Sequence, residues 1–423
     1  MRPSVRASFP RENAPRVAGT VAAVRVALLG LICAVLGAGA ALGIGRATGL
    51  VAGSTTVVVR EASTGPTTGS GPATHVTVAS PATGSASFSP ARIFAERSPG
   101  VVTVFTYTGG QGAQGSGFIV SADGTILTNA HVITNAGEAA AGATVKPAAQ
   151  VYVEFPDHDR IRATIVGWDV FDDVGVIRIS PSAHALQVLP LGRSADVVVG
   201  EPVAAIGSPL GNEDSLAVGV VSAVGRSIAA LTAPHFQLID AIQIDAPIAH
   251  GSSGGPLLDS SGHVIGINAQ IRSDVGGPAG IGFAVPIDAA RRSLRELVAG
   301  RKVGYAYAGV QTEDLTPSLA RHLGLRVSRG ALIDRVTPGG PAATAGLHAG
   351  TAEAEFQGVA VATGGDVVTA VNGLRVASAD DLVRIVTNTL RPGRTAVFSV
   401  VRGGRRRAIA VRLGSRPSDP QLP

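Results

Sequence analysis

Three short segments carry the side chains best able to do chemistry: a histidine, an aspartate and a serine, in that order along the chain. The segments are TNAHVI at 128–133, FDDVGVI at 171–177 and HGSSGGP at 250–256. Hydrolysis of a peptide bond needs a hydroxyl made nucleophilic by a positioned base, with a carboxylate that holds the base. We therefore predict that His131 is the general base, Asp173 the orienting acid and Ser253 the nucleophile.

Two of these assignments have a rival in the neighbouring residue. Asp172 could orient the base in place of Asp173. Ser252 could be the nucleophile, but the Gly-Gly pair that follows would then lie one residue out of register. The glycines of this turn allow the main-chain N–H groups of Gly251 and Ser253 to converge on a developing oxyanion.

The serine segment also satisfies G-x-S-x-G, the nucleophile turn of another hydrolase fold. That turn leads into a helix, whereas the residues after Ser253, PLLDSSGHVIGINAQI, read as strand, turn and strand. It also requires the acid and the base to follow the serine, and here His131 and Asp173 precede it. The context favours a protease over this alternative.

Taken together, the three segments resemble the chymotrypsin-like serine proteases, and in particular the HtrA/Deg branch with a C-terminal PDZ domain. TNAHV resembles the family's histidine segment, and Asp169 to Ile177 resembles its D-x-x-x-D-L-A-V-L pattern, in which the second Asp, here Asp173, is catalytic. Val174-Gly175 replaces the usual Leu-Ala. The resemblance implies a mostly β fold with a double β-barrel protease domain at 91–300.

The β content is also indicated by the residues themselves. Between 91 and 300, short runs rich in β-forming residues alternate with Gly, Asp and Asn turns, and Asp123-Gly124 between two apolar runs is a strong hairpin signal. Residues 286–300 read as a helix after the barrels. Asp288 is its predicted N-cap, and its predicted apolar stripe includes Val298.

Residues 305–413 resemble a PDZ domain, an α+β module that binds an extended peptide as an added strand. The loop that would hold the peptide's terminal carboxylate is Tyr307-Ala308-Gly309-Val310, in which Ala308 replaces a usual bulky residue. Ser378 and Asp381 form a capping-box-like start to a helix at 379–390. Leu382 and Ile385 on that helix would complete the peptide groove.

The N-terminal region has a different character. Residues 1–25 hold five arginines against one glutamate and predict a cytoplasmic basic segment, and 26–45 is an uncharged, mostly apolar run long enough to span a bilayer. A retained single-pass transmembrane helix is favoured over a cleaved signal peptide. Residues 46–90 then form a flexible linker, the protease and PDZ domains lie outside the membrane, and 414–423 is a short tail.

Composition excludes several other classes of protein. A single cysteine in 423 residues rules out an internal disulfide framework. The net charge of +5 arises largely from residues 1–25, and the arginines at 402–407 read as a solvated hairpin turn, so no nucleic-acid partner is predicted. The remaining histidines lack metal-ligand spacing, and neither a metal nor a cofactor is expected.

The resemblance implies an ATP-independent serine endopeptidase that degrades unfolded or damaged exported proteins and forms a homotrimer or larger assembly. The PDZ domain would bind peptide C-termini. Without an acid at an obvious pocket base, we expect cleavage after small or medium apolar side chains. Two rivals remain: a chaperone or scaffold with little proteolysis, and an esterase.

Overall fold

The computed structural model describes residues 88–137, 144–208, 215–230, 232–233, 236–248, 251–269 and 281–417. The predicted basic segment, the membrane span at 26–45, most of the linker and the end of the tail lie outside these residues. Within them, no helix combines the length and the apolar character that crossing a bilayer requires.

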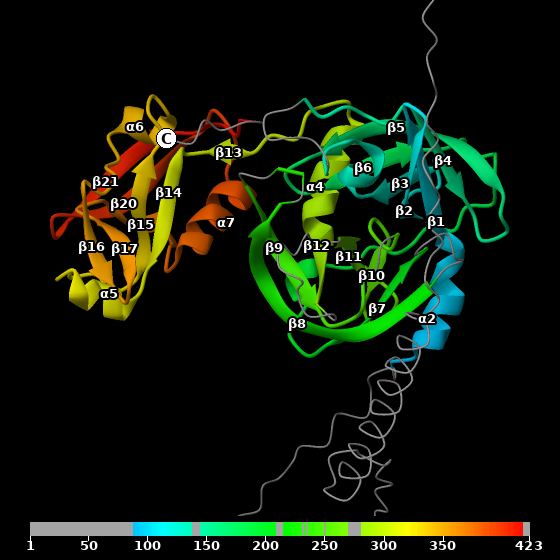
Figure 1. Cartoon of the computed structure of the whole chain (residues 1–423), viewed down its shortest axis with the longest axis horizontal. Helices are drawn as coiled ribbons and strands as arrows, with labels where there is room; N and C mark the ends of the chain where they lie inside the picture. The colour runs from blue at the N-terminus through cyan, green and yellow to red at the C-terminus, as the bar shows by residue number, and fades with distance from the viewer. Residues whose placement is uncertain are drawn as a thin grey trace, which may run out of the picture. The chain divides into compact units, whose positions relative to one another are not determined.

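The first half of the protease region closes into a six-stranded antiparallel barrel (Figure 1). Its strands, in spatial order, are β1 (Val101–Thr108), β2 (Gln111–Ile119), β3 (Thr125–Thr128), β6 (Val174–Arg178), β5 (Arg160–Asp169) and β4 (Gln150–Glu154). The barrel closes because β1 pairs with both β2 and β4. Branched aliphatic side chains such as Val102, Val104 and Ile126 fill its interior.

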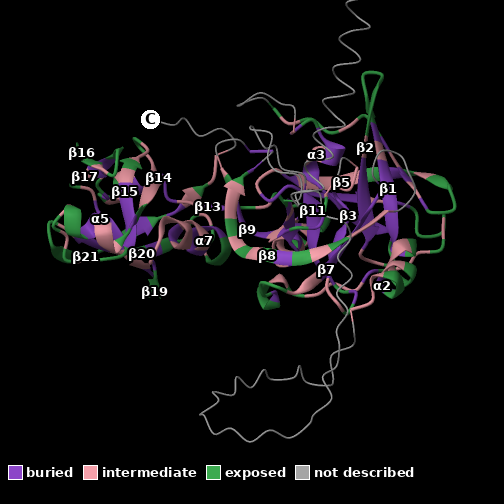
Figure 2. Ribbon diagram, turned by 60° about the horizontal axis from the view of Figure 1, so that its bottom comes forward, coloured by how far each residue is buried: buried purple, intermediate pink, exposed green. Residues whose placement is uncertain are grey.

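The second half forms another closed barrel of six strands. In spatial order they are β10 (Pro256–Leu258), β11 (Val264–Ala269), β12 (Gly282–Pro286), β9 (Gln237–Ile244), β8 (Ser215–Ala229) and β7 (Pro202–Gly207). Figure 2 shows buried residues along the strands of both barrels. The expected mostly β, double-barrel architecture is confirmed.

The predicted hairpin at Asp123-Gly124 joins β2 to β3. Gly124 adopts a positive φ of 84°, and a Cβ there would lie 2.2 Å from the Ile179 carbonyl oxygen, so only glycine fits. The Asp123 carboxylate accepts hydrogen bonds from the N–H and the hydroxyl of Thr125. This turn sets where β3 begins, and therefore where the residues after β3 lie.

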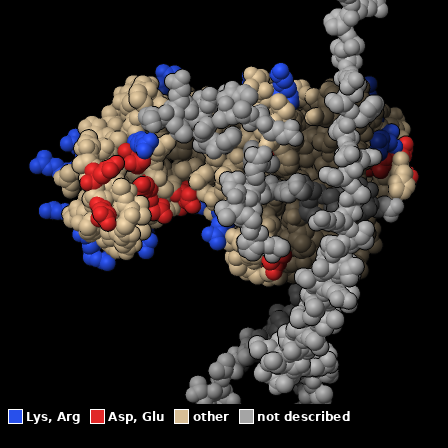
Figure 3. All heavy atoms as spheres, viewed as in Figure 1, with Lys and Arg blue, Asp and Glu red and all other residues tan. Residues whose placement is uncertain are grey.

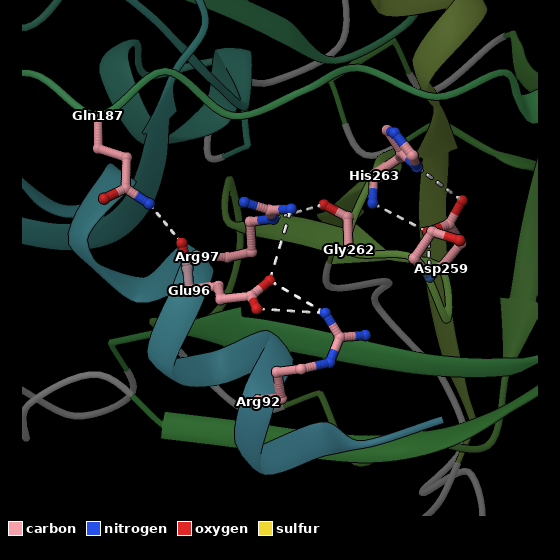
Figure 4. A network of polar contacts seen from close by, with 8 residues as sticks. Arg92, Glu96, Arg97, Gln187, Asp259, Gly262 and His263 are labelled. Atoms are coloured by element: carbon pink, nitrogen blue, oxygen red, sulfur yellow. Dashed lines mark hydrogen bonds and ion pairs between the residues drawn. The ribbon is translucent and has the colours of Figure 1, made fainter. Parts of the chain in front are cut away.

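A short helix, α2 (Pro90–Arg97), continues into the 3₁₀ turn η1 (Ser98–Gly100) before the first strand. Figure 4 shows how the end of α2 contacts two distant segments. The Arg97 Nε atom donates to the Gly262 carbonyl at 2.9 Å, and the Gln187 side-chain amide donates to the Glu96 carbonyl. Because Gly262 lies in the turn from β10 to β11, α2 braces the hairpin that follows the serine segment.

The helix predicted at 286–300 is observed as α4 (Ile287–Val298), packed against both barrels near β5, β6, β11 and β12. Two details of the prediction are wrong. The Asp288 carboxylate does not cap the helix; it accepts from Ser194 Oγ at 2.9 Å and Ala195 N at 3.1 Å, both in the 3₁₀ turn η2 (Ser194–Asp196). Val298 is 45% exposed, because it lies on the outer side of the last helical turn.

The C-terminal module is built on one antiparallel sheet with short helices. The sheet runs in the order β14 (Val310–Leu315), β15 (Gly330–Val336), β18 (Val367–Val371), β20 (Thr395–Arg402) and β21 (Arg405–Arg412), and β19 (Leu374–Arg375) pairs with β18. Two further strand pairs are β13 (Ala306–Tyr307) with β22 (Gly414–Ser415), and β16 (Ala352–Phe356) with β17 (Val359–Thr363). The helices are α5 (Pro317–His322), α6 (Pro341–Ala345) and α7 (Ala379–Thr389).

The predicted start of α7 is confirmed in detail. Ser378 Oγ accepts from the Asp381 N–H at 3.1 Å, and the Asp381 carboxylate accepts from the Ala377 N–H at 3.0 Å. The Ser378 bond satisfies a main-chain donor of the first helical turn, and the Asp381 bond ties down the residue before the cap. The Ala379 N–H donates to Asp314 Oδ1 at 2.7 Å, which ties the start of the helix to β14, an edge strand of the sheet.

Candidate active site

The pairing of β3 with β6 brings His131 and Asp173 together. The two strands run antiparallel with Thr128 opposite Gly175, so the residue two after Thr128 meets the residue two before Gly175. The Ala130 N–H accordingly donates to the Asp173 carbonyl at 3.2 Å. His131 follows in the single helical turn α3 (Ala130–Ile133).

The Asp173 carboxylate holds His131 at two points. Oδ2 lies 2.8 Å from the ring Nδ1, and Oδ1 accepts from the His131 main-chain N–H at 3.0 Å. Asp173 has a left-handed φ of 50°, which is unfavourable for a side chain with a Cβ, and its carbonyl accepts from Asn129 Nδ2 at 2.8 Å. The surrounding hydrogen bonds keep this residue in a strained conformation that aims its carboxylate at the imidazole.

This contact determines the basicity of His131. Burial disfavours the charged imidazolium, but the negative charge of Asp173 and its hydrogen bond outweigh burial and raise the pKa of His131 above its ordinary value of 6.5. A base of this kind is neutral, and able to accept a proton, at a pH above its raised pKa. We therefore expect activity that depends on neutral His131 to decline as the pH falls through the raised pKa of His131.

The alternative acid, Asp172, forms an ion pair with an arginine instead. Its Oδ2 lies 2.5 Å from Nη2 of Arg292 on α4, and only 5% of its side chain is exposed. The two consecutive carboxylates therefore have different partners: Asp172 has the guanidinium and Asp173 the imidazole.

The serine segment forms a tight turn that only glycine permits at several points. Gly251 and Gly254 have φ values of 95° and 90°. A Cβ on Gly254 would lie 2.1 Å from the Ser116 carbonyl oxygen, and one on Gly255 would lie 2.2 Å from the Ile206 carbonyl oxygen. This close packing explains why Gly-Gly must follow Ser253, which is itself only 5% exposed.

Ser116, on β2 of the first barrel, connects that barrel to the serine turn. Its N–H donates to the Ser253 carbonyl at 2.8 Å, and its hydroxyl donates to the Gly251 carbonyl at 2.6 Å and accepts from the Ser208 N–H at 2.9 Å. The Ser116 carbonyl accepts from Thr128 Oγ1 at 2.6 Å. One residue thus links the turn of Ser253 to the end of β3, from which His131 follows.

A cavity of about 270 Å³ lies beside the edge strand β14 and helix α7. Of the predicted groove residues, Tyr307, Ala308, Val310 and Leu382 line it, whereas Ile385 packs into the core of the module. Gly309 has a φ of 76°, and its carbonyl accepts from the Thr337 N–H at 2.9 Å, which fixes the loop. The other lining residues include Val383, Val386 and Arg416, with Phe236 and Gln237 from the barrel region.

Among the described residues, no group of three or more His, Cys, Asp or Glu side chains could hold a metal ion.

Comparisons with known proteins agree with this architecture. The trypsin-like peptidase domain family matches residues 115–267, and the PDZ domain family matches residues 306–413. The solved structure titled "HtrA-type protease AlgW with tripeptide" is 32% identical and superimposes with a TM-score of 0.64 over 78% of this chain and 98% of that one. The chain belongs to the HtrA-type protease family.

Curated relatives of this family member share its sequence over a similar span. Proteins named probable periplasmic serine endoprotease DegP-like, from Pseudomonas fluorescens and Hahella chejuensis, are 37% and 38% identical over 305 residues. That span is 72% of this chain but 57% and 58% of the relatives, so the chain spans little more than half their length. A serine endoprotease from Yersinia pestis is 28% identical, with a TM-score of 0.56, over 78% of this chain and 98% of that one.

Sequence reasoning did not single out Ser116 or Arg292. Ser116 is one serine in a Gly-rich strand, and its role depends on a contact 135 residues away along the chain. Arg292 reaches Asp172 across 120 residues. Neither position carries a local sequence signal.

Replacing Ser116 by alanine removes the hydroxyl that donates to Gly251 in the serine turn and accepts from the Ser208 N–H. We expect Ser116→Ala to lower kcat for digestion of fluorescently labelled casein about 10- to 100-fold, since small displacements of reacting groups have effects of this size. Ser222→Ala, at an exposed serine on β8, is the matched control and should retain wild-type activity. Wild-type kcat in Ser116→Ala would show that the hydroxyl does not position the turn.

Proposed function

We propose that this chain is an ATP-independent serine endopeptidase that uses Ser253, His131 and Asp173 as a catalytic triad. The observation that carries the proposal is the two-point contact of the Asp173 carboxylate with His131. It is supported by the bonds of Ser116 to the turn of Ser253, by the chain's membership of the HtrA-type family, and by relatives named serine endoproteases.

In the proposed reaction, His131 Nε2 takes the hydroxyl proton as Ser253 Oγ attacks the carbonyl carbon of the peptide bond. Asp173 Oδ2 accepts the Nδ1–H throughout and stabilises the imidazolium. The main-chain N–H groups of Gly251 and Ser253 donate to the oxyanion. His131 then gives its proton to the leaving amine, and a water molecule, activated by the same imidazole, releases the acyl group.

We propose that the enzyme acts on unfolded or damaged exported proteins outside the cytoplasmic membrane, with residues 26–45 as its single-pass anchor. The relatives are named periplasmic, which supports this location. A homotrimer or larger assembly belongs to the same proposal, as family resemblance implies. The proposal needs neither a metal nor a cofactor.

The Ser253→Ala variant tests the proposal against a chaperone or scaffold. In casein digestion by the full chain, the wild type should release fragments, and Ser253→Ala should lose at least about 10³-fold in rate, since the covalent step needs the hydroxyl. The Ser252→Ala variant is the matched control for the rival nucleophile and should keep most activity. Equal digestion by wild type and Ser253→Ala would refute the proposal, and equal absence of digestion would favour a scaffold.

We further propose that the cavity beside β14 and α7 binds the C-terminus of an extended peptide. An edge strand offers main-chain groups to an added strand, and the loop 307–310 would hold the terminal carboxylate. The lining side chains Val310, Leu382 and Val386 favour apolar residues at the end of the ligand. The AlgW structures titled with a tripeptide and with a decapeptide support a peptide ligand.

On the face drawn in Figure 3, Asp and Glu side chains gather on this module, with Arg and Lys around its margin.

This groove proposal predicts dependence on a free carboxylate. A fluorescent peptide that ends in apolar residues should bind about 10- to 100-fold more tightly than the same peptide with an amidated C-terminus, as expected for hydrogen bonds to a charged group. Val383→Glu should weaken binding by placing a second carboxylate in the groove. Val359→Glu, at an exposed site on β17, should not. Equal affinity for the acid and amide peptides in anisotropy titrations would contradict the proposal.

A further inference from the structure

Three carboxylates are buried within five residues of the turn from β5 to β6. Asp169, Asp172 and Asp173 are 4%, 4% and 5% exposed. Like charges so close together in a poorly hydrated site repel one another, and each needs a partner to remain ionised. Asp173 has His131, whereas the side-chain partners of Asp169 and Asp172 come from outside the barrel.

Those partners lie mainly on α4 and the segment after it. The Arg292 guanidinium lies 2.5 Å from Asp172, and the next residue, Ser293, donates to Asp169 Oδ2 at 2.6 Å. The Tyr305 hydroxyl also donates to Asp169 Oδ2. The Arg416 guanidinium lies over the rings of Phe171 and Tyr305, 5.2 and 5.0 Å from their centres.

The ionisation of this cluster is perturbed by its burial. Burial, and then the charge of Asp172, raise the pKa of Asp169 to about 6, although the bonds from Ser293 and Tyr305 oppose the rise. Burial raises the pKa of Tyr305 and lowers that of Arg416. Arg292 and Asp172 form the ion pair that joins α4 to this turn.

The ion pair of Asp172 also restrains the next residue, Asp173. The carboxylate of Asp172 is paired with Arg292 on α4, and the carboxylate of Asp173 is bonded to His131. Asp173 has the strained φ of 50°, so the turn needs external restraint to keep it there. The Phe171 N–H donates to the Asp169 carboxylate at 3.0 Å, which ties the start of the same turn.

Arg292 is itself held in place by several contacts. Its Nη1 donates to Asn388 Oδ1 on α7 at 3.0 Å, and its guanidinium lies 5.0 Å from the centre of the Tyr305 ring. Asn388 Nδ2 donates to Asp240 Oδ2 at 2.8 Å, and Arg384 Nε bonds Asp240 Oδ1 at 2.5 Å. The side chain of Arg292 is therefore held in one position by its contacts, unlike a solvent-exposed surface arginine.

We propose that Arg292 is a positioning residue for the catalytic carboxylate: its ion pair with Asp172 holds the turn that aims Asp173 at His131. The inference rests on the proposed triad. It assigns Arg292 no contact with substrate. Its effect on the reaction passes through the position of Asp173.

The sign of the change in the pKa of His131 separates positioning from a direct charge effect. Losing a nearby cation by itself favours the imidazolium and raises the pKa of His131. If the Asp173 carboxylate no longer points at His131, the imidazolium loses the anion that stabilises it, and the pKa of His131 falls. The double variant Asp172→Asn with Arg292→Met removes both charges of the ion pair, so its direct charge effect nearly cancels while the restraint is lost. Neutral replacements of a buried pair also tend to preserve folding.

The experiment measures two quantities on the full chain: the pKa of His131 by NMR titration of labelled histidine, and kcat on labelled casein. The His131 signal is assigned by its loss in His131→Asn. In the double variant, the pKa of His131 should fall by about one unit. Its kcat should fall about 10- to 100-fold with little change in KM. The single variant Arg292→Lys keeps Asp172 and a cation beside it. Its His131 pKa and its kcat should therefore lie closer to the wild-type values than those of the double variant.

The matched control is Arg291→Met on the same helix. Arg291 bonds Asp288 and the Leu191 carbonyl, away from the turn of Asp173, and its loss should change neither quantity. An unchanged or raised pKa of His131 in the double variant would overturn the inference. A pKa of His131 in Arg292→Lys as low as that in the double variant would overturn it too. Absence of casein digestion by the wild type would contradict the proposed function instead, and the NMR titration would still decide the role of Arg292.

Discussion

The antiparallel register between β3 and β6 is the constraint on which the site depends. Along these strands successive side chains enter different cores: Ile126 and Ile177 fill the first barrel, while Leu127 and Val176 pack in the core shared with the second barrel. A slip of one residue would exchange these faces, so burial fixes the register strongly. The positions of His131 and Asp173 are therefore set by hydrophobic packing as well as by polar contacts.

Polar contacts then bring in the remaining parts of the site. Ser116 extends from the first barrel to the serine turn of the second, and its shared hydroxyl ties Gly251 to Ser208. From the other direction, α4 presents Arg292 and Ser293 to the two acids that are not bonded to the histidine. The proposed catalytic residues are thus held on both sides by groups to which we assign no chemical step.

The sequence predicted the features that depend on local pattern or on family motifs. The double barrel, the hairpin at Asp123-Gly124 and the cap of α7 follow from turn residues and short-range hydrogen bonds, and all are observed. The Asp288 cap was wrong because Ser194, 94 residues away, offers the carboxylate a competing donor. Ser116 and Arg292 were missed for the same reason. Their roles arise from tertiary contacts that have no periodicity or spacing in the chain.

In the proposed mechanism Ser253 is the nucleophile and His131 activates it. Reaction of the full chain with a fluorophosphonate, followed by proteolytic fragmentation and mass-spectrometric mapping of the modified residue, tests this assignment. We expect a single adduct on Ser253 whose formation requires His131. An adduct on Ser252 or on any other serine, or equally rapid labelling after His131→Ala, would contradict it.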